Sequence, residues 1–296
     1  MWKYYVLRLA YLLLSRLPVR MLYAIARVFG DGAYLVRAGT RKAVTANMRR
    51  VMGPEAGERE VRRAAREVFR NATRYYADLL HIQHLDIQAF SQDRVEIEGI
   101  EYLAEAHRSG RGAVVVGAHF GNPEMSVQGV AAAGLSLFGF TEPLEPPALS
   151  DFTNRLRSRH GHVYRTVGYR SIREAMQRLK GGGLIAVLLD RDITGTGTPM
   201  PFFGAEAKIP LGGIDLALRT GADLILAKSR RLPGYRFRVQ IEPPLKVVRT
   251  GDMDADVRAI AQRVLAMLEE QIRSDPGQWA VLESIWPQNE RERPDS

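Results

Sequence analysis

The sequence predicts an α/β fold, a three-layer sandwich with a mainly parallel central sheet and helices on both faces. Short apolar runs rich in β-branched residues alternate with helical patterns along the 296 residues. Two runs, 113–117 and 184–190, are almost wholly apolar, as strands covered on both faces are. They lead directly to His119 and Asp190. Because ligands of open α/β sheets bind outside the carboxyl ends of strands, these two residues mark the expected site.

Composition narrows the class of protein. The chain is 46% hydrophobic and 25% charged, as globular proteins are. It has no cysteine, which excludes thiol catalysis, thiolate metal sites and disulfides. Its net charge of +9 favours anionic partners such as phospholipid, nucleic acid or an acidic carrier protein.

Residues 1–52 are expected to form hydrophobic helices, with a break at Pro18. The longest uncharged run, Leu9 to Ser15, is too short to span a bilayer, and no small-residue cleavage site follows it. Apolar helices flanked by aromatic and arginine side chains suit the membrane interface, although a core helix pair is the alternative. We therefore divide the chain into membrane-interface helices over 1–52 and an α/β domain over 53–296.

The helices and strands of the α/β domain are predicted from the spacing of apolar residues and from the glycines and prolines that interrupt it. Val61, Ala65, Val68 and Phe69 recur at helical spacing, and glycines close several helical segments. Helices are expected over 58–83, 99–110, 123–133, 149–160, 171–180, 210–220 and 254–273. Strands are expected over 95–99, 113–117, 135–141, 163–166, 184–190, 224–228 and 237–241. A glycine-rich loop is expected over 192–204.

The turn Gly117-Ala-His-Phe-Gly-Asn-Pro-Glu124 combines a strand end with a helix start. Asn122 is a good N-cap and Pro123 a good first helical residue. Glu124 then falls in the first helical turn, where the helix dipole favours a carboxylate. This arrangement can place a base, His119, beside an orienting acid at the carboxyl edge of the sheet.

Other chemistries lack their motifs. No nucleic-acid-binding signature appears, and the glycine patterns of dinucleotide sites, phosphate loops and nucleophile elbows are absent. His160 and His162 lack a third ligand at a recognisable spacing, so we interpret them as a solvated turn and expect no metal. What remains is a histidine base without a protein nucleophile. Such a site suits direct attack by a substrate hydroxyl on a thioester.

The His119-x4-Glu124 turn resembles that of the bacterial late acyltransferases of lipid A biosynthesis and of the related mycobacterial phosphatidylinositol mannoside acyltransferases. The resemblance covers nearly the whole chain. It includes the hydrophobic amino terminus, the basic patch around Asn47, and the segments 154–159, 189–192, 201–204 and 209–210.

The resemblance implies the fold of the glycerophosphate and lysophospholipid acyltransferases. It also implies transfer of a fatty acyl chain from acyl-coenzyme A or acyl carrier protein to a hydroxyl of a membrane glycolipid, with no cofactor and no acyl-enzyme. His119 would be the general base. Glu124 and Asp190 compete to be its acidic partner, and we favour Glu124.

The resemblance also suggests substrate-binding residues. Arg159 matches a family arginine and could bind a phosphate through its planar fork. Asp192, Phe202 and Phe203 are expected to line the substrate or acyl groove, with core packing as the alternative for the phenylalanines. Asn122 is also expected to bind substrate.

The amino-terminal apolar segment departs from that of the lipid A enzymes, since Arg8 interrupts it. We therefore expect peripheral attachment to an anionic membrane surface, on the cytoplasmic face of the bacterial inner membrane, and no nucleic-acid partner. The strand end Asp190-Arg-Asp192 is closer to the mannoside branch. Two other functions stay open: a non-catalytic lipid-binding protein, and a thioesterase in which His119 activates water.

Overall fold

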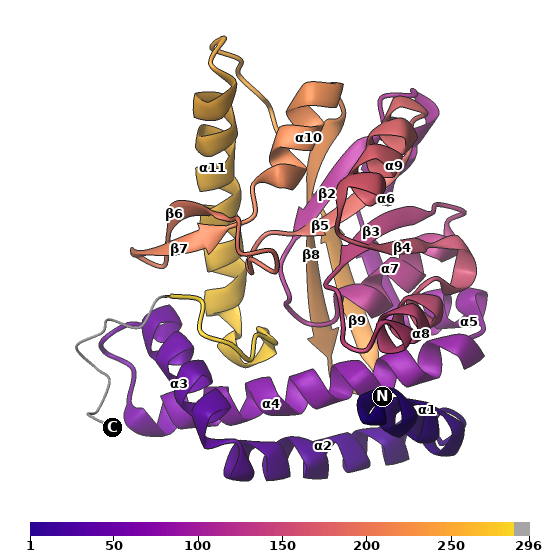
Figure 1. Ribbon diagram of the computed structural model, residues 1–296, viewed down its shortest axis with the longest axis vertical. Helices are drawn as coiled ribbons and strands as arrows, with labels where there is room; N and C mark the ends of the chain where they lie inside the picture. Colours follow the sequence, from indigo (N-terminus) through magenta and orange to yellow (C-terminus); the bar gives the residue numbers. More distant parts are fainter. Residues whose placement is uncertain (287–296) are drawn as a thin grey trace.

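The computed structural model describes residues 1–286 and shows a central sheet packed between helices (Figure 1). The helices are α1 (Trp2–Leu14), α2 (Val19–Val36), α3 (Ala38–Met52), α4 (Glu58–His81), α5 (Ile87–Arg94), α6 (Ile100–Arg108), α7 (Pro123–Ala132), α8 (Pro147–Arg157), α9 (Tyr169–Lys180), α10 (Gly212–Thr220) and α11 (Met253–Ser274). Short 3-10 helices lie at η1 (Ile82–His84), η2 (Arg159–Gly161) and η3 (Pro276–Gln278). The strands are β1 (Val95–Glu98), β2 (Ala113–Gly117), β3 (Leu137–Thr141), β4 (Val163–Thr166), β5 (Leu184–Leu188), β6 (Thr198–Phe202), β7 (Ala205–Ile209), β8 (Asp223–Leu232) and β9 (Arg236–Ile241).

The predicted mainly parallel sheet is confirmed. Its strand order is β1-β9-β8-β2-β5-β3-β4, and β2 lies between β8 and β5. Strands β2, β3, β4, β5 and β8 run parallel, whereas β9 pairs antiparallel with β8 and parallel with β1. The carboxyl ends of β2 and β5 therefore meet at one edge of the sheet.

The three layers follow from the alternation of side chains along the strands. Val114 and Val116 on β2 pack in one core cluster with residues of α9, α10 and α11. Val115 points to the opposite face, in a second cluster with residues of α5, α6 and α7. Because both faces of β2 are covered, its five residues are all buried.

The amino-terminal helices lie beyond the carboxyl edge of the central strands. Helix α4 runs across that edge, and α2 lies on the outer side of α4 (Figure 1). Helix α4 is amphipathic, and its apolar row Val61, Ala65, Val68 and Phe69 is buried in the core. Within residues 1–286, none of the helices combines the length and apolar character needed to cross a bilayer.

Helix α5 and the hairpin of β6 and β7 were not expected from the sequence. Residues 87–94 form helix α5, which Asp86 caps by accepting hydrogen bonds from the amides of Gln88 and Ala89. Part of the expected loop 192–204 is strand β6, which pairs with β7 in a separate two-stranded hairpin. Its prolines, Pro199 and Pro201, favour a loop in sequence, but an isolated two-stranded hairpin leaves edge positions where proline is tolerated.

Candidate active site

His119 lies in the tight turn between β2 and α7. Gly121 has φ +67°, and an added Cβ there would lie 2.8 Å from the Cα of Arg230 on β8. The turn therefore needs glycine both for its backbone conformation and for its close approach to the sheet. Asn122 then caps α7, because its Oδ1 accepts hydrogen bonds from the amides of Glu124 (3.1 Å) and Met125 (3.3 Å). The predicted strand, turn and capped helix are all present.

His119 and Asp190 form a hydrogen-bonded pair across the ends of β2 and β5. His119 Nδ1 lies 2.9 Å from Asp190 Oδ1, and the His119 amide donates to Asp190 Oδ2 at 3.0 Å. Asp190 is fully buried, whereas about a third of the His119 side chain is exposed. A carboxylate at Nδ1 keeps the proton on that nitrogen and leaves Nε2 as the basic atom. The pair can therefore act as a general base toward a ligand at the exposed side of the ring.

Asp190 is held in its charged form despite its burial. Burial by itself raises the pKa of this carboxyl group. The nearby charge of His119 and the hydrogen bonds from His119 and the Trp279 indole outweigh that effect, and the pKa lies below its ordinary value. Asp190 is consequently a permanent acceptor for the imidazole near neutral pH.

Glu124 does not partner His119, and our preference for it is corrected. Its carboxylate accepts hydrogen bonds from the hydroxyls of Tyr75 on α4 (2.9 Å) and Tyr164 on β4 (2.8 Å). It also forms an ion pair of 3.0 Å with Arg157 at the end of α8. Five residues after the histidine, the chain has already turned into α7, so this carboxylate is directed toward α4, α8 and β4.

The side chains of Glu124, Tyr75, Tyr164 and Arg157 form a largely buried network of hydrogen bonds and one ion pair. Burial raises the pKa of the Tyr75 and Tyr164 hydroxyls well above their ordinary value, so both stay protonated donors. Glu124 and Arg157 each expose only about one seventh of the side chain. The network joins the first turn of α7 to three neighbouring elements and thereby fixes the helix that follows His119.

Asn122 is fully buried and positions the turn from inside. Besides capping α7, its Nδ2 donates to Asp78 Oδ2 on α4 at 2.6 Å. The same carboxylate oxygen accepts from Arg231 on β8 at 2.6 Å, and Asp78 Oδ1 accepts from the Tyr23 hydroxyl on α2 at 2.7 Å. The expected substrate contact is replaced by a structural one, because Asn122 exposes no surface.

The three residues expected to line a groove also serve the fold. Asp192 accepts hydrogen bonds from the amides of Thr194, Gly195 and Gly197 and so shapes the loop after Asp190. Phe202 and Phe203 expose 0% and 6% of their surface and pack with Trp279 and Trp286. For the phenylalanines the core-packing alternative is therefore the one that the structure shows.

The arginine that the structure places beside Glu124 is not Arg159 but Arg157, the last residue of α8. Arg159 lies on η2 and is exposed, whereas Arg157, two residues earlier, faces Glu124. His162 is also not part of a solvated turn, since it exposes only 2% of its surface and its Nδ1 accepts from the amide of Leu137. Within residues 1–286, no group of three or more His, Asp or Glu side chains is placed to hold a metal ion.

An apolar cavity of about 70 Å³ lies beside the strand end that leads to His119. It is bounded by α7 through Pro123, Val127 and Val130, and by β5 through Ala186 and Leu188. Residues 115–117 of β2 and the next residue, Ala118, also line it. The cavity is thus lined mainly by apolar side chains and extends to Ala118, the residue before His119.

Sequence reasoning missed Trp279, which bonds Asp190, and the three side chains that bond Glu124, which are Tyr75, Arg157 and Tyr164. Helical spacing carried a signal for Arg157, because it lies four residues after the buried Thr153. Trp279 lies in a short segment after α11. No local sequence pattern predicts where this segment packs. The Trp279 indole nevertheless donates to Asp190 Oδ2 at 2.7 Å.

Comparison with known proteins shows the family of the chain. Residues 1–288 match the family model of bacterial lipid A biosynthesis acyltransferases. A phosphatidylinositol mannoside acyltransferase of Mycobacterium tuberculosis (strain H37Rv) is 29% identical over 272 residues, which cover 89% of this chain and 83% of the relative. One from Mycolicibacterium smegmatis is 28% identical over 265 residues, covering 88% and 84%. The resemblance found in the sequence is confirmed, and the chain belongs to the bacterial lipid A biosynthesis acyltransferase family and is an acyltransferase.

Proposed function

We propose that this enzyme transfers a fatty acyl chain from a thioester, acyl-coenzyme A or acyl carrier protein, to a hydroxyl of a membrane glycolipid. The observation that carries the proposal is the pairing of His119 with the buried carboxylate of Asp190. It leaves Nε2 as a base on the exposed side of the ring. Among residues 1–286, no serine or threonine hydroxyl is hydrogen-bonded to this imidazole, so the acceptor itself supplies the nucleophile.

The reaction then needs one base and no acyl-enzyme. Nε2 of His119 removes the proton of the acceptor hydroxyl as its oxygen attacks the thioester carbonyl carbon. The tetrahedral intermediate collapses by breaking the carbon–sulfur bond. The thiolate leaves with the proton that His119 had taken, so the imidazole returns to its starting state. Asp190 stabilises the transient imidazolium without itself accepting a proton.

The apolar cavity supports the acyl part of the proposal. It lies beside Gly117 and Ala118, immediately before His119, and side chains of α7 and β5 line it. The first carbons of a chain that entered this cavity would lie at the carboxyl edge of β2, beside the residue that precedes His119. The named relatives act on phosphatidylinositol mannosides. An acceptor of this class, a glycolipid with free sugar hydroxyls, is therefore the first to test.

Charge supports attachment to an anionic membrane. Residues 1–52 contain ten Lys and Arg side chains and one acid, Asp31, so the surplus there equals the whole net charge of +9. A surface with this surplus attracts acidic lipids, each basic residue near the surface contributing about 1 kcal/mol.

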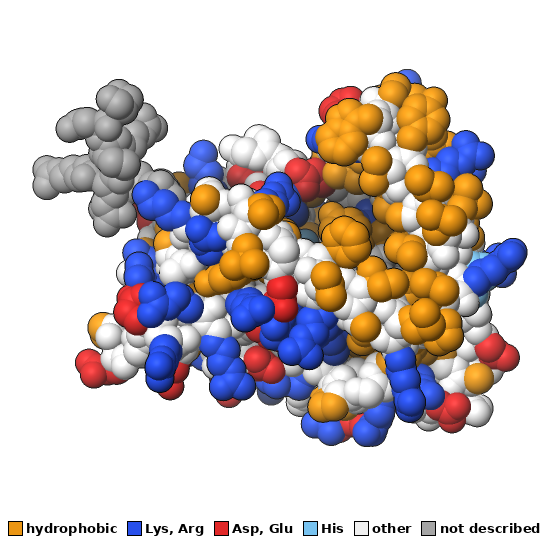
Figure 2. Space-filling model, turned by 90° about the horizontal axis from the view of Figure 1, so that it is seen from below, with side chains coloured by type: hydrophobic (Ala, Val, Ile, Leu, Met, Phe, Trp, Pro, Cys, Tyr) orange, Lys and Arg blue, Asp and Glu red, His pale blue; other side chains and the backbone are white. Residues whose placement is uncertain are grey.

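Exposed apolar side chains lie on α1 and α2, within the same residues 1–52. In Figure 2, which views the molecule from the side of α2 and α4, hydrophobic side chains gather over one part of the face, with Lys and Arg beside them. Apolar patches of this kind mark interaction sites. The large exposed hydrophobic side chains of α1 and α2 are Trp2, Tyr5, Val6, Leu9, Leu12, Leu13, Met21, Val28, Phe29, Leu35 and Val36.

The deciding experiment measures thiol release from palmitoyl-coenzyme A by the purified protein, with and without a glycolipid extract, for wild type and His119→Ala. Release that needs both the extract and His119 supports the proposal, and the mass of the product identifies the acceptor. A carrier-protein donor is tried in parallel, because positive charge suits either donor.

Two other outcomes point elsewhere. Release that depends on His119 but not on added glycolipid would mean that water is the acceptor and that the enzyme is a thioesterase. Lipid binding without turnover, with either donor, would leave a non-catalytic lipid-binding protein. Both results contradict the proposed transfer.

A further inference from the structure

A segment far from His119 in sequence is paired with the catalytic turn. The backbone of residues 278–280 runs antiparallel to that of residues 119–121, with a bridge between Phe120 and Trp279. The amide of Ala280 donates to the His119 carbonyl at 2.8 Å, and the amide of Gly121 donates to the Gln278 carbonyl at 3.0 Å. The residues after α11 thus hold the turn that carries the histidine through two backbone hydrogen bonds, one at His119 and one at Gly121.

The same segment reaches the aspartate through a side chain. The indole N–H of Trp279 donates to Asp190 Oδ2 at 2.7 Å, and that oxygen also accepts from the His119 amide. The other oxygen, Oδ1, is left to face His119 Nδ1. Trp279 and Asp190 are both fully buried, so hydrogen bonds from the protein take the place of solvent around this carboxylate.

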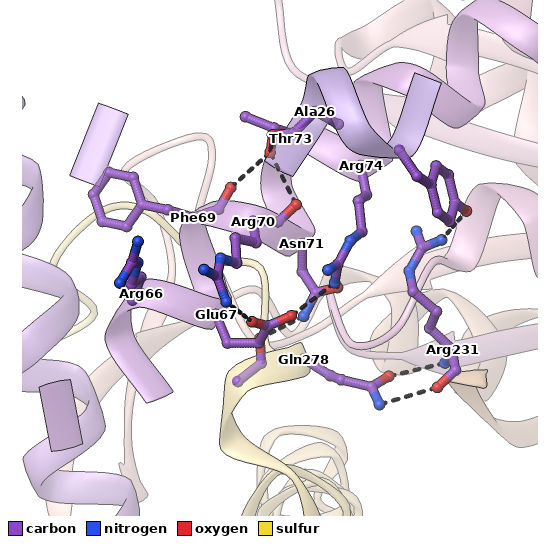
Figure 3. Close-up of polar contacts among 12 residues, drawn as sticks. Ala26, Arg66, Glu67, Phe69, Arg70, Asn71, Thr73, Arg74, Arg231 and Gln278 are labelled. Atoms are coloured by element: carbon purple, nitrogen blue, oxygen red, sulfur yellow. Dashed lines mark hydrogen bonds and ion pairs between the residues drawn. The ribbon is translucent and has the colours of Figure 1, made fainter. Parts of the chain in front are cut away.

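Independent contacts hold the segment in place. Gln278 forms two hydrogen bonds with the backbone of Arg231 on β8, accepting from its amide at 2.8 Å and donating to its carbonyl at 3.1 Å. Asn71 on α4 donates to the Gly277 carbonyl at 2.8 Å. Figure 3 shows Gln278 lying against Arg231, with Asn71 approaching from α4. Trp279 is therefore positioned by two elements that do not depend on Asp190.

We propose that Trp279 is a positioning residue of the acyl transfer: its indole N–H fixes the orientation of the Asp190 carboxylate, and the carboxylate in turn fixes the His119 ring. The inference rests on the proposed function. With Oδ2 occupied by two donors, Asp190 has one free oxygen to offer the imidazole, and Nε2 keeps a single direction. Without the indole N–H, the carboxylate can rotate, and it carries more negative charge toward the imidazole.

The test compares Trp279→Phe with Trp286→Phe. Trp286 is a matched control because it is buried in the same aromatic cluster, and its indole donates to a backbone carbonyl, that of Phe202, at 3.0 Å. Both variants lose a buried indole N–H donor. The Trp279 variant alone loses a donor to Asp190.

For Trp279→Phe we expect kcat to fall by about ten-fold or more, which is the size of effect associated with a hydrogen bond to a charged group. KM should stay within about two-fold of wild type, since substrate contacts are not removed. The rise of kcat with pH should also move to higher pH, because the freed carboxylate holds the imidazolium proton more firmly. Trp286→Phe should leave kcat within about two-fold and the pH profile unmoved.

Equal kcat losses and unshifted pH profiles in the two tryptophan variants would overturn the inference, since they would reduce Trp279 to a packing role. If Trp279→Phe fails to fold, β-(3-benzothienyl)alanine at position 279 removes the N–H and keeps the ring shape, and the same outcomes apply. His119→Ala distinguishes failure of the proposed function from failure of the inference about Trp279. Full activity in that variant overturns the proposed function and this inference together, whereas an inactive His119→Ala beside a fully active Trp279→Phe overturns this inference alone.

Discussion

Glu124 and Arg157 form a largely buried ion pair of 3.0 Å that lies apart from the hydrogen bond between His119 and Asp190. The two acids that follow strand ends in the sequence thus have separate tasks. Asp190 bonds the imidazole, whereas Glu124 joins α7 to α4, α8 and β4 through Tyr75, Arg157 and Tyr164.

The first prediction follows from this division. Asp190→Asn should lower kcat by about 10² to 10⁴, because an amide would bring its own N–H groups against His119 or Trp279 and spoil the tautomer. Glu124→Gln should lose less kcat but lower the free energy of unfolding by about 3 kcal/mol, since it leaves Arg157 buried without its counter-charge. Thiol release and urea unfolding, measured on both variants, check the two halves.

The comparison of kcat and unfolding free energy between Asp190→Asn and Glu124→Gln decides which acid partners His119. If Glu124→Gln were the less active of the two while unfolding like wild type, the assignment of the acids would be reversed. Glu124→Asp serves as a control, because it keeps the charge and should recover part of the stability.

The edge of the sheet that carries the site could be predicted from sequence, because two apolar runs end near His119 and Asp190. Which acid bonds the histidine could not. The spacing of His119 and Glu124 places both on one turn, but the direction of the Glu124 side chain depends on Tyr75 and Tyr164, which come from distant elements. Local pattern carries no information about those partners.

The packing of Phe202 and Phe203 was likewise not predictable from local sequence. Phe202 and Phe203 stand in a glycine- and proline-rich stretch, which favours an exposed loop, yet they pack against Trp279 and Trp286 from the carboxyl-terminal segment. Trp279 itself reaches Asp190 only because α11 returns the chain to the sheet edge. Side chains brought together by tertiary contacts of this kind are the part of the site that required coordinates.

His162 predicts a pH dependence of stability. Burial lowers its pKa from an ordinary 6.5 to about 4, so the folded chain keeps this ring neutral while the unfolded chain takes up a proton. Its contribution is therefore complete above pH 6.5 and is lost as the pH falls from there to about 4. The shift corresponds to the order of 3 kcal/mol.

His162→Asn isolates this contribution, because the amide oxygen can accept from Leu137 but does not titrate. The free energy of urea unfolding should fall more steeply for wild type than for the variant between about pH 7.5 and about pH 4. Parallel curves for the two proteins would show that the His162 ring is protonated in the folded state.

The membrane surface gives a third prediction. Leu13→Asp places a charge on the exposed apolar side of α1 and should weaken binding to vesicles of acidic phospholipid by about ten-fold or more, from the lost burial of one leucine. Raising NaCl from about 50 mM to about 500 mM should weaken wild-type binding too, since the basic residues of α1 to α3 are screened. Vesicle cosedimentation measures both effects.

Val248→Asp is the matched control for this surface. Val248 is also exposed, but it lies in the connection between β9 and α11. In Figure 1 that connection enters α11 at the top of the molecule, whereas α2 lies at the bottom. Substitution of Val248 should leave vesicle binding unchanged. Equal losses for the two variants would place the membrane contact elsewhere.

The cavity beside His119 gives the last prediction, which concerns chain length. Val127 on α7 and Ala186 on β5 both line the cavity. Val127→Phe should fill part of it and shift the preferred donor toward shorter acyl chains, whereas Val127→Ala should enlarge it and favour longer ones. Each methylene excluded from an apolar site costs about 0.8 kcal/mol, or roughly four-fold in kcat/KM. The measurement is kcat/KM over a series of acyl-coenzyme A donors from decanoyl to stearoyl, with thermal unfolding to show that both variants are folded. Opposite shifts of the optimum in the two variants are needed, because a general loss of packing lowers kcat/KM for every donor alike and would leave the order of preference as it is in wild type.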